Sequence, residues 1–317
     1  MFRLKRIRNL NILITGSTGF IANNLISTLR KDNKVYCQSR SLQKNDDGII
    51  NFKHDLINDS WDALNLPNFE VVYFLSAQTS NYIARDNPYL DLQSNLLSLI
   101  NLIEYFRKKK EKPFIVYTGT LTQLGYTRNI ILDENYKSNP QTFYDLSKQT
   151  AENYLLRYIK ENIVFGTALR LCNIYGRNPL NKSLDRDILS KVYNFASAGK
   201  NVKLFGDGQY KRDYLHIDDL ITALKLAYKF KKTTNGNYYL LGTGESVSLT
   251  DAFNEIIDLA NANHNTKTTI EYVDPPSNLY EIEYRDVLVN PSKFYNDTGW
   301  KPKFLFKEGV KEVFNQI

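Results

Sequence analysis

The sequence predicts an α/β protein, in which a doubly wound parallel sheet is joined to a smaller C-terminal α/β lobe. Three observations lead to this prediction. Residues 11–40 follow the order strand, glycine turn, helix, strand, which is the repeating unit of such sheets. Residues 70–75 are apolar after the first position, as expected for a parallel strand covered on both faces. At 317 residues, the chain is long enough for a main domain and a smaller lobe.

The glycine turn occupies residues 15–22 (TGSTGFIA), and a helix over residues 23–31 and a strand over 34–38 follow it. Gly16 permits a backbone angle that a side chain would forbid, and Gly19 lets the main chain approach a pyrophosphate. The helix N-terminus adds unpaired N–H groups and a partial positive charge. The unit therefore predicts a dinucleotide site with contacts from Gly16, Thr18, Gly19, Phe20 and Ile21. An ordinary tight turn between a strand and a helix has the same spacing.

The end of the second strand would meet the adenosine ribose of the dinucleotide. An acidic residue there would accept a hydrogen bond from the 2′-hydroxyl, whereas neutral Ser39 followed by Arg40 suits a 2′-phosphate. We therefore predict NADP(H) as the favoured cofactor and NAD(H) as the alternative, although an exposed arginine without a cofactor role fits the same pattern. Asp55 and Leu56 end the next short strand, where a carboxylate would bind the adenine amino group or cap a loop.

Small and polar residues follow the next two predicted strands at their carboxyl ends, where open α/β sheets bind ligands. Ser76, Ala77 and Gln78 come after the strand 70–75, where the nicotinamide half of the cofactor needs a close approach. Thr120 follows the next predicted strand, which covers residues 114–117. We expect Ser76 and Ala77 to contact the cofactor, and Gln78 and Thr120 to contact the substrate.

Helical periodicity predicts long helices over residues 89–109 and 144–161. Asn95 lies beside the apolar stripe of the first of these helices. It is either a buried structural amide or a neighbour of the tyrosine that begins the second helix. In the C-terminal lobe, Ser248 is predicted to cap a further helix.

Tyr144 and Lys148 are four residues apart at the start of a predicted helix, so their side chains project from one face. An ammonium close to a phenol lowers the pKa of the tyrosine from about 10, which makes the phenol a usable general acid or base near neutral pH. Thr120 would bind the same substrate oxygen. A Tyr/Lys pair on a helix surface is common, but all three residues downstream of a dinucleotide turn favour catalysis.

The chain resembles the extended short-chain dehydrogenase/reductase family, in particular its nucleotide-sugar epimerase, dehydratase and ketoreductase branch. The matching motifs occur in order along nearly the whole sequence. They are TGSTGFI at 15–21, TGTLTQLG at 118–125, YDLSK at 144–148, RLCNIYG at 170–176, FGDGQYKRDY at 205–214 and GWKP at 299–302.

The resemblance implies a role for each residue of the site. Tyr144 would exchange a proton with a sugar hydroxyl or ketone, Lys148 would bind the nicotinamide ribose, and Thr120 would steady the reacting oxygen. Asn173 would contact the sugar nucleotide, and Arg212 would hold its diphosphate. The family's later diphosphate arginine has no clean counterpart in this chain; the displaced candidate is Arg285.

Dehydratases of this branch place an Asp-Glu pair directly after the catalytic threonine, whereas Leu121 and Thr122 stand there in this chain, which argues against a 4,6-dehydratase. The leading hypothesis is an NAD(P)-dependent oxidoreductase acting at C4 of a nucleotide-activated (deoxy)hexose, as a 4-ketosugar reductase in surface-polysaccharide sugar biosynthesis. The alternative is a nucleotide-sugar 4-epimerase with tightly bound NAD. Ser39 and Arg40 favour the reductase, because enzymes that consume their coenzyme commonly use NADPH. A non-catalytic dinucleotide-binding relative would have lost the Tyr-x-x-x-Lys pair, whereas this chain has both Tyr144 and Lys148.

Residues 1–177, which also receive about 209–235, are predicted to form the dinucleotide-binding Rossmann domain. Residues 178–208 and 236–317 are predicted to form the substrate-binding lobe. Apolar stripes near Leu99 and Leu155 suit a homodimer, as in the family, and burial in the core would produce the same stripes.

The net charge of +7 draws attention to nucleic acids, but Lys and Arg residues are scattered apart from residues 3–8 and 107–112. The first run is expected to be a solvated tail, and the second ends a helix, where cations complement the dipole. We therefore expect an anionic nucleotide sugar as the partner and no nucleic acid. No apolar run approaches the ~20 residues that span a membrane. With no signal-peptide core either, a cytoplasmic protein without membrane contact is expected.

The two cysteines, Cys37 and Cys172, lie in apolar runs far apart in the sequence, as buried thiols in a reducing compartment do. The three histidines are dispersed and have no metal-ligand spacing. We therefore expect neither a disulfide framework nor a metal site.

Overall fold

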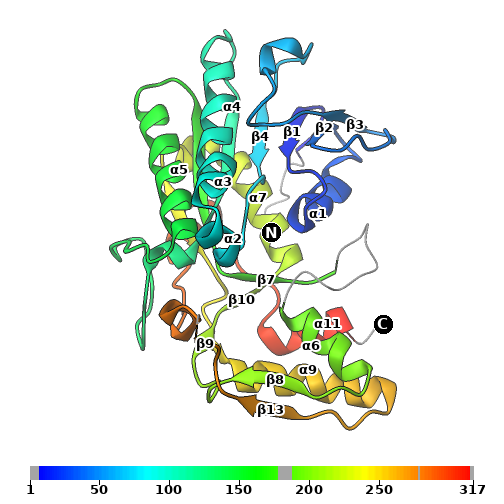
Figure 1. The fold of residues 1–317 in the computed structure, drawn as a ribbon. Helices are drawn as coiled ribbons and strands as arrows, with labels where there is room; N and C mark the ends of the chain where they lie inside the picture. The colour runs from blue at the N-terminus through cyan, green and yellow to red at the C-terminus, as the bar shows by residue number, and fades with distance from the viewer. Residues whose placement is uncertain (1–6, 178–187, 278, 315–317) are drawn as a thin grey trace. The chain divides into compact units, whose positions relative to one another are not determined.

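The computed structural model describes residues 7–177, 188–277 and 279–314, which form two compact units (Figure 1). Unit 1 contains the chain up to Gln123 together with Pro140–Arg170 and Ile221–Tyr239. Unit 2 contains Leu124–Asn139, Leu171–Leu220 and the chain from Leu240 onwards. Part of the basic N-terminal run (residues 3–6) and part of the predicted lobe (178–187) lie outside the described residues.

The boundaries of the units differ from the predicted domains at residues 124–139, 171–177, 209–220 and 236–239. The first segment shows the reason, because its partners lie late in the chain. Leu132 N donates to Leu288 O at 2.8 Å, and Leu240 N donates to Glu134 Oε1 at 2.9 Å. Such pairings between distant residues leave no periodic signal in the sequence.

The central sheet is parallel, as predicted, and it has seven strands in the described residues. In spatial order they are β11 (Tyr238–Leu241), β6 (Phe165–Leu171), β5 (Phe114–Thr120), β4 (Val71–Phe74), β1 (Asn11–Thr15), β2 (Lys34–Ser39) and β3 (Ile49–Lys53). Chain order reverses direction at β1, which pairs with β2 on one side and β4 on the other. Register places Thr15 beside Phe74, so the segments that follow β1 and β4 leave the same edge of the sheet. This is the switch point where such sheets bind ligands.

The helices predicted from residues 23, 89 and 144 begin within three residues of those positions, and further helices are associated with unit 1. Together they are α1 (Phe20–Leu29), α2 (Asn81–Asp86), α3 (Pro88–Leu92), α4 (Ser98–Arg107), α5 (Phe143–Lys160), α7 (Ile217–Lys229), which starts in unit 2, and α8 (Lys231–Thr234), with short 3-10 turns η1 (Trp61–Ala63) and η3 (Leu121–Leu124). The prediction of a single helix over residues 89–109 was wrong in one respect. A π-helical turn, η2 (Gln93–Leu97), interrupts it between α3 and α4.

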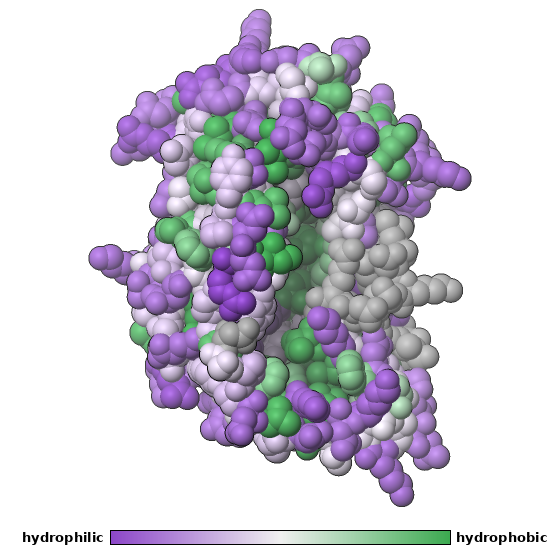
Figure 2. All heavy atoms as spheres, in the orientation of Figure 1, coloured by the Kyte–Doolittle hydropathy of each residue, from purple (hydrophilic) through white to green (hydrophobic). Residues whose placement is uncertain are grey.

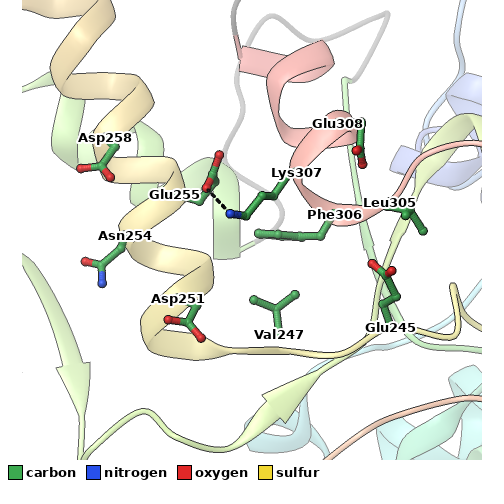
Figure 3. A pocket seen from close by; sticks show the side chains of 10 residues that line it. All are labelled: Glu245, Val247, Asp251, Asn254, Glu255, Asp258, Leu305, Phe306, Lys307 and Glu308. Atoms are coloured by element: carbon green, nitrogen blue, oxygen red, sulfur yellow. Dashed lines mark ion pairs between the residues drawn. The ribbon is translucent and has the colours of Figure 1, made fainter.

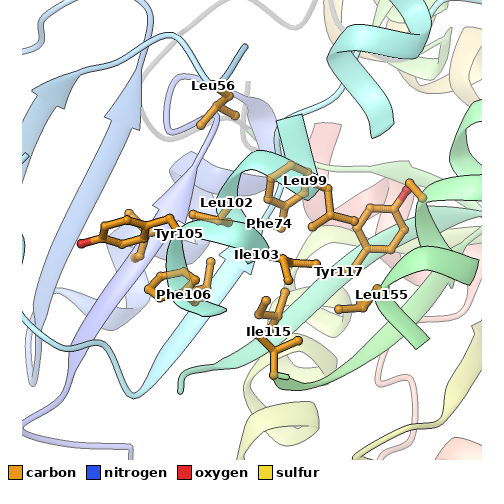
Figure 4. Packing of buried hydrophobic residues seen from close by; sticks show 14 of the residues in the cluster. Leu56, Phe74, Leu99, Leu102, Ile103, Tyr105, Phe106, Ile115, Tyr117 and Leu155 are labelled. Atoms are coloured by element: carbon orange, nitrogen blue, oxygen red, sulfur yellow. The ribbon is translucent and has the colours of Figure 1, made fainter. Parts of the chain in front are cut away.

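The core of unit 1 packs α4 and α5 against the sheet. Figure 4 shows Leu99, Leu155 and Tyr117 within this cluster of buried side chains, and the first two are fully buried. The apolar stripes near Leu99 and Leu155 are therefore explained by core packing, which was one of the two origins predicted for them.

The described residues of unit 2 contain three short strand pairs and several helices. The strands are β7 (Asn173–Tyr175) with β10 (Tyr214–His216), β9 (Lys211–Arg212) with β12 (Val247–Ser248), and β8 (Val202–Phe205) with β13 (Ile270–Val273). The helices are α6 (Ile188–Ser197), α9 (Leu249–His264), α10 (Ser292–Thr298) and α11 (Phe306–Phe314), with the 3-10 turn η4 (Glu281–Tyr284). Ser248 caps α9 as predicted, since its hydroxyl accepts from Asp251 N at 3.0 Å.

On the face drawn in Figure 2, hydrophilic residues are interspersed with smaller groups of hydrophobic ones. Within the described ranges, we find no helix with the length and apolar character needed to cross a membrane.

Candidate active site

The glycine turn follows β1 in unit 1, at the switch point of the sheet. Gly16 has a φ of +65°, and a Cβ at this position would lie 3.0 Å from Ser76 Cα. Both the backbone angle and the close approach therefore require glycine. Gly19 is the N-cap of α1, and no side chain there bonds to the N–H groups of the first helical turn.

The residues around this turn fit a pyrophosphate. Ser17 has a buried hydroxyl with no hydrogen-bond partner among the described residues. The first turn of α1 has no acidic residue, so nothing opposes an anion at the positive end of the helix dipole. Thr18 is exposed on this turn, while Phe20 and Ile21 are half-buried at the start of α1. A dinucleotide would be held here by backbone N–H groups and hydroxyl groups.

Gln38 is a buried residue on β2 that the sequence analysis missed. Its Oε1 accepts a hydrogen bond from Gly16 N at 3.0 Å, and its Nε2 donates to His54 O. The side chain thereby ties the glycine turn to the end of β3. A lone amide inside an apolar strand was the only signal that the sequence offered for it.

Ser39 ends β2, as predicted within one residue, and its buried hydroxyl donates to Ser41 O. Arg40 follows and is exposed. No carboxylate stands at this strand end, so the position that selects between the two dinucleotides is occupied by a hydroxyl and a cation.

Asp55 caps a loop, which is one of the two roles predicted for it. Its carboxylate accepts from Ile57 N at 2.9 Å and from Asn58 Nδ2 at 3.1 Å. The hydrogen bond from Ile57 and, more weakly, the charge of Arg40 lower the pKa of Asp55. Leu56 is buried in the core of unit 1. A contact of either residue with adenine stays a prediction.

The segment after β4 lies against the glycine turn. Ser76 N donates to Thr15 Oγ1 at 3.2 Å, and the side chain of Ser76 faces Gly16. Ala77 is exposed. Gln78 already has partners at both ends of its amide, because Nε2 donates to Asp91 Oδ1 at 2.9 Å and Oε1 accepts from Ser80 N. Its contact with substrate stays a prediction.

The structure brings Thr120 and Tyr144 together. Thr120 ends β5, and Tyr144 is the second residue of α5, whose start is set by a capping box of Thr142 and Asp145. A hydrogen bond joins the Thr120 hydroxyl to the Tyr144 phenol. The same hydroxyl lies 3.0 Å from Thr122 Oγ1. Thr122 stands where a dehydratase would have a carboxylate, so a hydroxyl replaces an acid at this position.

Lys148 is buried one helical turn after Tyr144, and its Nζ donates to Thr118 O at 2.7 Å. The ammonium also lies 4.4 Å from the centroid of the Tyr117 ring. Burial lowers the pKa of Lys148 to about 7, and the charges of Glu152 and Asp91 oppose this shift.

The expectation that Lys148 lowers the pKa of Tyr144 was wrong. Burial, together with the charge of Asp145, raises the pKa of Tyr144, and the hydrogen bond from Thr120 is what opposes the rise. Lys148 does not lower it, because its ammonium is directed to a backbone carbonyl and its own charge is disfavoured by burial.

A buried ion pair underlies this group and was also missed by the sequence analysis. Arg170 Nη2 lies 2.7 Å from Glu152 Oε1, with side-chain exposures of 5% and 1%. Gln123 Nε2 donates to Glu152 Oε2 at 3.1 Å, and the Glu152 carboxylate packs against Gly119. Glu152 therefore links α5 to β6 and to the turn after Thr120.

The predicted substrate ligands from the second half of the chain lie in unit 2. Arg212 is buried and donates to Glu283 O at 2.6 Å and to Arg285 O, so its guanidinium clamps the η4 segment. Arg285 is also buried, and its Nη1 donates to Ile282 O at 2.7 Å. Asn173 begins β7 and is half-buried. Their contacts with a diphosphate or sugar stay predictions.

Unit 2 also holds a pocket of about 490 Å³ between α9 and α11 (Figure 3). It contains none of the predicted site residues. Five carboxylates line it, from Glu245, Asp251, Glu255, Asp258 and Glu308. Lys307 faces Glu255 at 3.8 Å. No group of three or more His, Cys, Asp or Glu side chains in the described part of the chain is arranged to hold a metal ion.

Comparison with known proteins gives consistent matches. The model of the NAD dependent epimerase/dehydratase family matches residues 12–242. A Methanocaldococcus jannaschii protein, provisionally named UDP-glucose 4-epimerase, is 27% identical over 311 residues, which cover 96% of this chain and 97% of that protein.

Two solved structures share the fold across nearly their full length. UDP-glucose 4-epimerase from Thermotoga maritima, solved with UDP-glucose, has a TM-score of 0.84 at 23% identity and covers 96% of this chain and 98% of its own. UDP-glucuronic acid 4-epimerase from Bacillus cereus, solved with UDP-glucuronic acid and NAD, has a TM-score of 0.82 at 20% identity, with coverages of 96% and 98%.

Proposed function

Because this chain belongs to the NAD-dependent epimerase/dehydratase family, we propose that it is a nucleotide-sugar 4-epimerase that retains NAD. The observation that carries the proposal is the cluster of Thr120, Tyr144 and Lys148 in the same unit as the glycine turn. The relative and the two structures described above carry 4-epimerase names, which favours this reaction over the reductase that the sequence analysis placed first.

In this proposal, bound NAD supplies the hydride acceptor and donor, and the protein handles the proton. Tyr144 holds the proton that is exchanged with the C4 oxygen of the sugar. Thr120 orients the phenol through their shared hydrogen bond and offers its hydroxyl to the same oxygen. Lys148 and the turn from Gly16 to Ile21 would hold the dinucleotide. An epimerase must then present the other face of the sugar to the same site.

The second candidate is an NADPH-dependent 4-ketosugar reductase in polysaccharide sugar biosynthesis. The specific observation that favours it is the end of β2, where Ser39 and exposed Arg40 provide a hydroxyl and a positive charge for a 2′-phosphate. A 4,6-dehydratase is disfavoured, because Leu121 and Thr122 replace the acidic pair.

The test starts from purified protein without added coenzyme. Small molecules released on denaturation are identified by mass spectrometry, and native protein is incubated with UDP-glucose and analysed by chromatography. Retained NAD with formation of the C4 epimer is the expected result. Consumption of added NADPH with a 4-ketosugar, and no retained NAD, would instead establish the reductase. Absence of both nucleotide binding and turnover would overturn the proposal.

We also propose that the chain forms a homodimer through an exposed apolar face on α3 and α5. Leu92, Leu146 and Tyr154 on these helices are 40%, 52% and 46% exposed. They differ from the buried residues near Leu99 and Leu155 that first suggested an interface. Light scattering coupled to size exclusion would report the dimer mass, and Leu146→Glu is expected to shift it to the monomer.

Affinity for NAD is expected to fall as pH rises above about 7. Burial lowers the pKa of Lys148 to about 7 in this structure. Binding of the dinucleotide favours the ammonium, so above that pKa protonation of the amine costs about 1.4 kcal/mol, or tenfold in affinity, per pH unit. Calorimetric titration of the nucleotide-stripped protein from pH 6 to 9 measures this slope. Lys148→Met should bind more weakly at pH 6 and show no slope; a wild-type affinity that is flat over this range would contradict the assignment.

A further inference from the structure

A buried carboxylate lies beside α5, on α3. Asp91 is 1% exposed, and the π-helical turn η2 that follows carries Asn95, which is fully buried. Both α3 and η2 pack against α5. A π turn inside a helix is frequent at functional sites, because it re-aims side chains that a regular helix would direct elsewhere. Here it brings an amide to the same place as the carboxylate.

Asp91 is the centre of a hydrogen-bonded group. Its Oδ1 accepts from Gln78 Nε2 and from Asn95 Nδ2, both at 2.9 Å. Asn95 Nδ2 also donates to Ser147 Oγ at 3.1 Å, and Asn95 Oδ1 accepts from Gln78 N at 3.0 Å. Ser147 Oγ donates to Tyr144 O at 3.0 Å. The group therefore joins the loop after β4 to the helical turn that carries the catalytic tyrosine and Lys148.

The charges that act on Lys148 are those of Glu152 and Asp91, and the ring centroid of Tyr117 lies 4.4 Å from its ammonium. The Tyr117 phenol carries no charge near neutral pH, because burial raises its pKa. Glu152 has the larger electrostatic effect on the lysine, but its charge is matched by the Arg170 guanidinium at 2.7 Å.

Asp91 forms no ion pair with a basic side chain in the part of the chain that the structure describes. Burial raises the pKa of Asp91, and the hydrogen bonds from Gln78 and Asn95 and the charge of Lys148 oppose that rise. Lys148 is the basic side chain whose charge acts on Asp91 in the described part of the chain.

We propose that Asp91 is a positioning residue whose buried carboxylate keeps the Lys148 amine in the charged form that binds the dinucleotide, and whose hydrogen bonds hold the Gln78 loop against α5. This inference rests on the proposed function, since it assumes that Lys148 contacts NAD. It assigns to one buried acid both the geometry of the loop after β4 and the charge state of the lysine.

The test is the pH dependence of NAD affinity in Asp91→Asn. Asparagine keeps an oxygen that accepts the hydrogen bonds from Gln78 and Asn95, and its NH2 group replaces Oδ2, which has no hydrogen-bond partner among the described residues. The midpoint of the decline in affinity is expected to move to lower pH by roughly half to one unit, which makes binding at pH 8 about three- to tenfold weaker. A midpoint equal to that of the wild type would overturn the proposal.

Three further variants separate charge from structure. Asp86→Asn removes the same charge from an exposed side chain and should leave the midpoint unchanged. Asp91→Glu retains the charge and should keep a midpoint near that of the wild type, whereas a shift equal to that of Asp91→Asn would contradict the role of charge. Asp91→Ser is a second neutral variant, to be measured in the same way if Asp91→Asn does not fold. A wild-type protein that binds no NAD would overturn the proposed function itself, and this inference with it.

Discussion

Tyr144→Phe is expected to lower kcat by roughly 10²–10⁴-fold while changing the affinity for NAD by less than about twofold. The substitution removes one hydroxyl and keeps the ring, so the start of α5 and its capping box are preserved. The lost group is the phenolic hydroxyl, which is hydrogen-bonded to Thr120 at the end of β5. Turnover of UDP-glucose and calorimetric titration with NAD, on the same preparation, measure the two quantities separately.

Tyr154→Phe is the matched control, because Tyr154 lies on the same helix and is 46% exposed. It should keep the turnover of the wild type. If Tyr144→Phe retained full activity, Tyr144 would not be the acid or base, whatever the family of the chain. A parallel loss of NAD affinity would instead indicate that the substitution had disturbed the cofactor site.

Arg170→Met is expected to lower the free energy of unfolding by about 3–5 kcal/mol, because it leaves the Glu152 carboxylate buried without its cation. The carboxylate would keep only the neutral hydrogen bond from Gln123. Loss of the guanidinium also removes its contact with the Tyr238 ring, whose centroid lies 4.2 Å away. Urea unfolding followed by circular dichroism measures the change.

Arg157→Met provides the control for this stability prediction. Arg157 pairs with Glu161 at 2.8 Å, but both side chains are exposed, at 68% and 50%. The cost there should be about 0.5 kcal/mol or less. Adding Glu152→Leu to Arg170→Met removes both charges and should restore most of the lost stability. If the double variant were no more stable than Arg170→Met, an unpaired buried charge would not be the cause.

Much of the fold could be predicted from the sequence because its signals are local. The order of strands, the glycine turn and the start of α5 each depend on a few neighbouring residues, and the structure shows them within a few positions of the prediction. The motif residues of the cofactor turn follow β1 for the same reason. The family resemblance came from these local motifs, and the family match confirms it.

Other features could not be predicted, because their causes lie between distant residues. The π turn at Gln93–Leu97 interrupts a helix whose periodicity looked regular. Asn95 on it is buried, as one of the two predictions for it stated, but its partner Ser147 lies 52 residues further along the chain. Arg212 matched a diphosphate-binding motif, yet its partners are carbonyls in the segment 283–285. No spacing rule indicates such pairings.

The sequence by itself determined the order of the elements, the dinucleotide turn and the spacing of Tyr144 and Lys148, because backbone angles and helical periodicity act over a few residues. Only the tertiary structure decided which buried charges act on one another: Asp91 and Glu152 on Lys148, and Arg170 on Glu152. Those interactions depend on how the sheet and helices pack. Burial then sets the pKa of each group, so the charge state of the site follows from the fold as a whole and not from any motif.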